Sequence, residues 1–270
     1  MRARFDREYI GSELGRIGRR LDTPITVYLI GGGAMAFRDL KTTTKDIDLV
    51  VTSGDDLRVL QAVLHDCGYE IVADPGEAYD TLGAQRIFEN DDGCRIDLFN
   101  RQVVDKLVLS DGMRQRSESH LDTGRLTVAL VSSADIFLFK SVAGRTDDIE
   151  DLFGLVQTGL NFDTIADELT QQIDLLGQEL FVSHINEALL ELEAQYNVTT
   201  PLAEPISEIT ERVYQELEVL NAFDDSITQP ELSAKLSLPP NDLEDAIESL
   251  ENKNVITVEN GRITKQSTTL

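Results

Sequence analysis

The sequence predicts an α/β (α+β) protein with a mixed sheet, in three parts: a first domain over residues 1–160, a helical extension over 161–200 and a winged-helix-like region over 206–270. In the first part, short β-branched runs alternate with amphipathic stretches, which is typical of a sheet covered by helices. From 147 to 197 the apolar residues recur only at helical spacing. The stretch TTPLAEP, with two prolines, then indicates a linker.

The first domain is expected to begin with an amphipathic helix over 5–21. The run TVYLI (26–30) predicts a buried strand that ends in three glycines and turns into a short helix over 34–40. The run DIDLVVT (46–52) predicts the next strand. Further along, the pattern predicts helices over 55–67, 100–109 and 133–142, and strands over 69–73, 85–89, 94–99 and 126–130.

The last region has the element order of a winged helix-turn-helix: a long helix, two shorter helices, and a hairpin around Asn260-Gly261. Its third helix, which would enter the DNA major groove, carries Asn241, Asp242, Glu244 and further acidic residues. We therefore expect this region to contact protein or to mediate dimerisation rather than to bind DNA, although DNA binding stays open.

The charge of the chain is extreme, with 49 acidic against 24 basic residues and a net charge of −25. This balance is typical of a cytoplasmic protein from a salt-loving organism, where a solvated acidic surface maintains solubility. It makes the chain a poor candidate for nucleic-acid binding by bulk electrostatics, which requires Lys and Arg to displace counterions. No run has the length of a signal peptide core or a membrane span, so we expect a soluble cytoplasmic protein without membrane partners.

Three carboxylates are expected to converge at one edge of the sheet. Asp46 and Asp48 alternate at the head of one strand and point to the same face, and Asp97 lies on a second strand. Unpaired carboxylates beside a buried strand repel one another and lose solvation, whereas divalent cations relieve both penalties. The alternative is that Asp46 is only a solvated residue at the start of a strand and that the Asp-x-Asp spacing arose by chance.

Four motifs in order carry a family resemblance: GGGAM (31–35), TTTK leading into DID (42–48), RIDLF (95–99) and SADIFLFKSVAGRTDDIEDL (133–152). Together they resemble the nucleotidyltransferase fold of the polymerase-beta type, specifically the minimal and AbiEii-like toxin–antitoxin-associated transferases. The resemblance covers about the first 160 residues, and the order of separate motifs is more specific than any one of them.

The resemblance implies a role for each matching residue. Gly32 and Gly33 would let the backbone approach a triphosphate, and the amides of the following helix would face its anionic oxygens. Asp46, Asp48 and Asp97 would hold two magnesium ions, or manganese, and Asp97 would orient or deprotonate the attacking hydroxyl.

On the same resemblance, Lys140 would meet the triphosphate, with Arg145 beside it and Asp148 either orienting that arginine or capping the next helix. Lys45 would add a phosphate contact. Each of these residues has a purely structural alternative. The glycines could serve a tight turn, Lys140 could extend its ammonium from an apolar helix face to solvent, and Arg145 and Asp148 could form an exposed ion pair of little consequence.

The implied activity is the transfer of a nucleoside monophosphate from an NTP to a hydroxyl of a macromolecule, with release of pyrophosphate. The implied partners are the NTP, an acceptor that is a protein or a tRNA end, and a cognate toxin or antitoxin. The alternative is a non-catalytic nucleotide-binding or regulatory adaptor that uses its winged helix to bind a partner or DNA. The sequence leaves the nucleobase and the acceptor undetermined.

Overall fold

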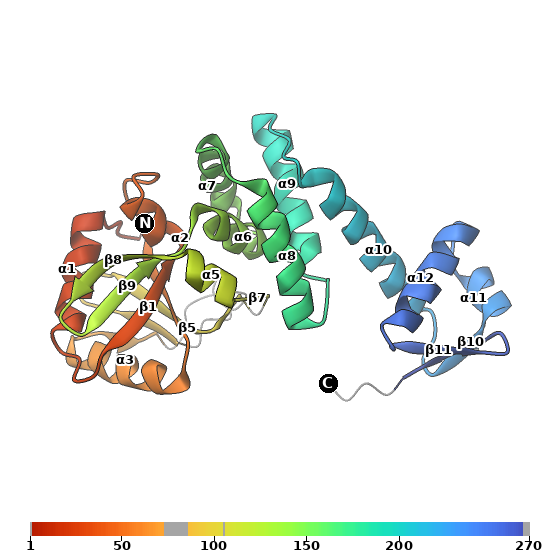
Figure 1. Ribbon diagram of the computed structural model, residues 1–270, viewed down its shortest axis with the longest axis horizontal. Coiled ribbons are helices and arrows are strands. Elements are labelled where there is room, and N and C mark those ends of the chain that lie inside the picture. Colours follow the sequence, from red (N-terminus) through yellow and green to blue (C-terminus); the bar gives the residue numbers. More distant parts are fainter. Residues whose placement is uncertain (1, 73–85, 105, 267–270) are drawn as a thin grey trace. The chain divides into compact units, whose positions relative to one another are not determined.

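The computed structural model describes residues 2–72, 86–104 and 106–266. The chain divides into two compact units, Met1–Ala203 and Glu204–Leu270 (Figure 1). The first unit contains both the sheet and the helices that the sequence assigns to an extension. Each unit is described by itself.

The first unit is built on a seven-stranded mixed sheet with the strand order β3-β4-β5-β2-β1-β9-β8. Strand β1 runs antiparallel to β2 and parallel to β9, and the central strand β2 runs parallel to β5. This arrangement confirms the mixed α/β class. The strands are β1 (Ile25–Ile30), β2 (Asp46–Val51), β3 (Glu70–Ile71), β4 (Arg86–Glu89), β5 (Arg95–Asn100), β8 (Glu118–Thr123) and β9 (Leu126–Leu130).

Helices cover the sheet as the amphipathic patterns predict. Helix α1 (Arg7–Gly18) packs against β8 and β9, and α3 (Gly54–Asp66) packs against β2 and β5 (Figure 1). The short helix α2 (Gly31–Phe37) contacts β1 and β2. It begins at the first glycine of the cluster, three residues earlier than the sequence predicts, because Gly31 adopts a left-handed conformation (φ +60°) at the corner.

The helix expected over 100–109 is wrong. The structure has a two-stranded antiparallel ribbon there, β6 (Gln102–Val103) with β7 (Leu107–Val108), followed by α5 (Asp111–Arg116). The side chain of Gln172 supplies a reason: its amide accepts from the N–H of Val108 at 2.9 Å and donates to the C=O of Val108 at 2.7 Å. A residue 64 positions away thus satisfies the backbone of β7, which local sequence does not reveal.

Four helices complete the first unit and lie beside one another in Figure 1: α6 (Ser133–Ala143), α7 (Thr146–Gln157), α8 (Phe162–Leu176) and α9 (Val182–Tyr196). Helix α6 is buried along almost its whole length because α7, α8 and α9 all pack against it. The guanidinium of Arg116 joins α5 to this group by contacting Asp135 and Glu168, each at 2.6 Å.

The second unit has the element order that the sequence predicts. Helices α10 (Ala203–Asn221), α11 (Gln229–Lys235) and α12 (Pro240–Asn252) accompany a three-stranded sheet of order β10-β12-β11, with β10 (Ser226–Thr228), β11 (Ile256–Glu259) and β12 (Arg262–Lys265). Asn260 and Gly261 both have positive φ, as a two-residue hairpin turn requires. Among the residues that the structure describes, no helix is long and apolar enough to cross a membrane.

Candidate active site

The parallel pairing of β2 with β5 places Asp48 directly beside Asp97. Neighbouring residues in register on two strands point to the same face of a sheet, so both carboxylates project from one side. Asp46 lies two residues before Asp48 and shares that face. The antiparallel partner of Asp48 on β1 is Ile30, immediately before the glycine corner. The three aspartates named from the sequence therefore gather at the sheet edge where β1 ends.

Asp97 is the most buried of the three carboxylates, with 1% of its surface exposed. Its Oδ1 atom is buried and has no hydrogen-bond partner within the described part of the chain. Burial, followed by the charges of Asp48 and Asp46, raises the pKa of Asp97 well above its ordinary value. A buried, unsatisfied anionic oxygen costs free energy that a bound cation would offset.

Asp48 lies against the glycine corner. A Cβ added to Gly31 would come within 2.3 Å of the Oδ2 atom of Asp48, so a side chain at this position would require the Asp48 carboxylate to move. Burial and the charge of Asp46 raise the pKa of Asp48 to about 6, although the nearby charges of Arg145 and Lys140 oppose this shift. The corner thus holds the Asp48 carboxylate close to the start of α2.

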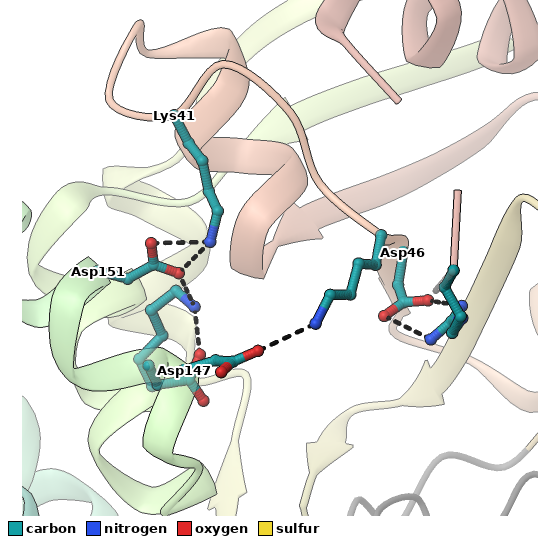
Figure 2. Close-up of polar contacts among 8 residues, drawn as sticks. Lys41, Asp46, Asp147 and Asp151 are labelled. Carbon is teal, nitrogen blue, oxygen red and sulfur yellow. Dashed lines mark hydrogen bonds and ion pairs between the residues drawn. The ribbon is translucent and has the colours of Figure 1, made fainter. Parts of the chain in front are cut away.

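Asp46 is ion-paired with Arg2, whose guanidinium donates to both carboxylate oxygens. Dashed lines at the carboxylate of Asp46 mark this contact in Figure 2. The charge of Arg2 also lowers the pKa of Asp97, so the arginine lies near the carboxylates as a whole. The N-terminal segment is held in place by two backbone hydrogen bonds between Phe5 and Thr44, at 2.8 and 2.9 Å.

Arg145, like Lys140, adds positive charge near this carboxylate group. It immediately precedes α7, and its charge lowers the pKa of both Asp48 and Asp97. Its Nε atom is buried without a hydrogen-bond partner in the described residues. Asp148, which the sequence pairs with Arg145 as one option, contacts Lys140 at 2.6 Å instead.

Three lysines form ion pairs with three aspartates of α7, and Figure 2 labels Lys41, Asp147 and Asp151 among them. Lys140 is nearly buried and contacts both Asp148, at 2.6 Å, and Asp151, at 2.7 Å. The ammonium group of Lys140 therefore does not extend to solvent, which was the structural alternative for this residue. Lys41 contacts Asp151 at 2.6 Å, and Lys45 contacts the exposed Asp147 at 2.9 Å.

The two glycines after Gly31 have packing reasons of their own. A Cβ on Gly32 would lie 2.4 Å from the Oγ1 atom of Thr44, and a Cβ on Gly33 would lie 3.0 Å from a methyl carbon of Leu29. The glycine cluster therefore allows the loop that precedes β2, and the side chain of Leu29, to pack tightly on the first turn of α2. A phosphate-binding role for Gly32 and Gly33 stays a prediction.

The donor set suits a hard divalent cation, because Asp46, Asp48 and Asp97 offer only carboxylate oxygens and one of these is buried without a partner. In residues 2–72, 86–104 and 106–266, however, no group of three or more Asp, Glu, His or Cys side chains has a geometry that could hold a metal ion. Asp46 is ion-paired with Arg2, so its carboxylate already has a basic partner. The chemistry of the residues thus fits magnesium at Asp48 and Asp97, while Asp46 would first have to leave Arg2.

The sequence names seven side chains that meet in this region: Asp46, Asp48, Asp97, Lys45, Lys140, Arg145 and Asp148. Four further residues join them in the structure: Arg2, Gly31, Lys41 and Asp151. Gly31 could have been found from the glycine run itself. No sequence signal separates Lys41 or Asp151 from the other charged residues around them.

The free energy of unfolding of the metal-free protein is expected to fall as the pH rises from about 4 to about 7, in part because of Asp48. The folded-state pKa of Asp48 is about 6 against an ordinary 3.8, so the stabilisation from its protonated form is full below about pH 3.8 and is lost as the pH rises through 6. Asp48→Asn should remove about 1–2 kcal/mol of this decline, allowing for the partial exposure of the side chain.

Urea unfolding in EDTA at constant KCl measures this effect. Asp167→Asn, at an exposed position on α8, should retain the wild-type slope and serves as the control. An identical pH dependence in wild type and Asp48→Asn would contradict the prediction.

Comparison of the sequence with protein-family models and with curated proteins found no match. Among solved structures, one described as the complex structure of CCA-adding enzyme with CTP aligns with 93% of this chain and 73% of its own, at 15% identity and a TM-score of 0.26. At this identity and TM-score the likeness supports no conclusion about the fold or the activity of the chain.

Proposed function

We propose that the protein is a metal-dependent nucleotidyltransferase, which transfers a nucleoside monophosphate from an NTP to a hydroxyl of a macromolecular acceptor. The observation that carries the proposal is the register of Asp48 beside Asp97, with an unpartnered Asp97 oxygen and with Arg145 near both carboxylates. Carboxylates that can bind a divalent cation and basic side chains that can bind phosphate then lie around one sheet edge, as nucleotide phosphate chemistry requires.

Each residue receives a role from its surroundings. Asp97 is the candidate to orient or deprotonate the attacking hydroxyl, because it is the most buried of the three carboxylates and its Oδ1 atom has no hydrogen-bond partner in the described residues. The hydroxyl oxygen forms a bond to the α-phosphorus, and the bond from that phosphorus to the β-phosphate oxygen breaks, releasing pyrophosphate. Arg145 supplies charge to the phosphates through its unpartnered Nε–H.

Magnesium, or manganese, held by Asp48 and Asp97 and by Asp46 after release from Arg2, would offset the negative charge of the transferred phosphoryl group. Lys45 exchanges the exposed Asp147 for a phosphate oxygen, since an exposed ion pair is weak and readily replaced. Lys140 acts with less freedom, because two carboxylates already hold its ammonium group.

Incubation with radiolabelled NTPs, magnesium, and RNA or cell-lysate protein at molar KCl tests the proposal. Transfer of label to a macromolecule is expected with wild type and with Asp167→Asn, and neither Asp48→Asn nor Asp97→Asn should support it. Label transfer that survives both active-site substitutions would rule the proposal out. The same assay separates RNA from protein as the acceptor, and a genetically linked toxin or antitoxin partner is one candidate among the proteins.

The ion pair between Arg2 and Asp46 favours the alternative, a protein that holds nucleotide without turnover, because it occupies one of the three carboxylates. Calorimetric binding of an NTP with magnesium, without label transfer to any acceptor, would support this adaptor role.

A further inference from the structure

We propose that Lys41 is a polyphosphate-binding residue of this site and meets the β- and γ-phosphates. Asp151 positions both Lys41 and Lys140. The inference rests on the proposed nucleotidyl transfer. The sequence singled out Lys45 and Lys140, so Lys41 and Asp151 are additions from the structure.

The stem of Lys41 lies over the glycine corner. Its Cδ atom would be 4.0 Å from a Cβ at Gly32, which is van der Waals contact. The loop that carries Lys41 is fixed by Thr44, whose side chain packs on Gly32 and donates to the C=O of Asp46 at 3.1 Å. Lys41 therefore spans from the first turn of α2 to α7, as Figure 2 shows for its contact with Asp151.

Asp151 brings two ammonium groups to a single carboxylate oxygen. Its Oδ2 atom lies 2.6 Å from the Nζ atom of Lys41 and 2.7 Å from that of Lys140. Two like charges this close are held together only by an anion between them. Although burial alone raises the pKa of Asp151, the two lysines lower it below its ordinary value, so the carboxylate stays ionised and fixes both cations.

The two lysines differ in exposure, and this difference indicates that Lys41 is the one that can contact phosphate. The side chain of Lys140 is only 8% exposed, whereas that of Lys41 is 28% exposed. An ammonium group has three donors, so Lys41 can keep Asp151 and still donate to a ligand oxygen. The positive charge of Lys140 lowers the pKa of Asp48, so the two lysines lie near the carboxylates. A polyphosphate bound between Arg145 and Lys41 would meet positive charge at both ends.

Isothermal titration with inorganic tripolyphosphate and with a non-hydrolysable ATP analogue, each with magnesium, tests the inference. Lys41→Gln is expected to weaken both affinities about tenfold or more, the usual effect of losing a charge-assisted hydrogen bond. Lys235→Gln is the control, since Lys235 is a lysine of the second unit whose ammonium donates to a backbone carbonyl. It should bind as wild type does.

Asp151→Asn tests the positioning role. It is expected to weaken tripolyphosphate binding, and the double variant Lys41→Gln/Asp151→Asn should lose less affinity than the sum of the two single losses, because Asp151 acts in part through Lys41. An additive loss would contradict positioning. Circular dichroism and thermal melting establish that each variant is folded before its affinity is interpreted.

The outcomes separate the two proposals. Wild-type affinity in folded Lys41→Gln would overturn this inference and leave the proposed function intact. Failure of the wild type to bind tripolyphosphate or any NTP with magnesium would overturn both.

Discussion

Replacing Asp97 with asparagine is expected to raise the melting temperature of the metal-free protein by several degrees and to reduce nucleotidyl transfer by at least about 1,000-fold. The two effects have one cause. The Asp97 carboxylate is buried, one oxygen has no partner in the described chain, and two neighbouring aspartates repel it. Asparagine removes the buried charge and with it the cation ligand and the base.

Differential scanning calorimetry in EDTA and then in magnesium measures the stability effect. Magnesium should raise the melting temperature of the wild type, because a ligand that binds the folded state stabilises it, and should have little effect on Asp97→Asn. Asp167→Asn, which changes an exposed carboxylate, should respond to magnesium as the wild type does. A melting temperature that rises equally with magnesium in Asp97→Asn would show that Asp97 holds no cation.

Replacing Gly31 with alanine is expected to destabilise the protein by about 2 kcal/mol and to reduce transfer about 100-fold. The left-handed backbone at Gly31 (φ +60°) costs a residue with a Cβ about 1 kcal/mol. The new methyl would also lie 2.3 Å from the Oδ2 atom of Asp48, so that carboxylate has to move. The displacement affects catalysis beyond the loss of stability, because Asp48 is a ligand of the proposed cation.

Gly54→Ala is the matched control, because Gly54 also begins a helix, and a Cβ there would meet no atom within 4 Å. This variant should retain wild-type transfer and stability within about 0.5 kcal/mol. Urea unfolding and the transfer assay at saturating magnesium give both quantities. If Gly31→Ala lost stability but transferred label at the wild-type rate, the proposed role of Asp48 as a ligand of the cation would be wrong.

The strands that carry the site could be predicted because their signals are local. The run DIDLVV combines a polar start with a β-branched, buried end, and β2 spans those six residues. The glycine cluster correctly indicated a corner between strand and helix. The Asn260-Gly261 turn likewise set the hairpin of the second unit through residues that tolerate positive φ.

Prediction failed where a distant residue supplied what the local sequence did not. The stretch 100–109 carries apolar residues at a spacing that also suits a helix, yet it forms the β6-β7 ribbon with Gln172 bonded to the backbone of Val108. Burial and pairing provided by another element outweigh a local propensity of a few tenths of a kcal/mol per residue.

By itself the sequence determined those helices and strands of this protein whose signals are local, and the kinds of side chain at the sheet edge, because periodicity, glycines and carboxylate spacing are properties of neighbouring residues. Only the tertiary structure decided that Asp48 and Asp97 share a register, that Arg2 pairs with Asp46, and that Asp151 joins Lys41 to Lys140. Such partners lie tens of residues apart along the chain. They meet through strand order and helix packing, which minimise the free energy of the whole unit rather than of any one segment.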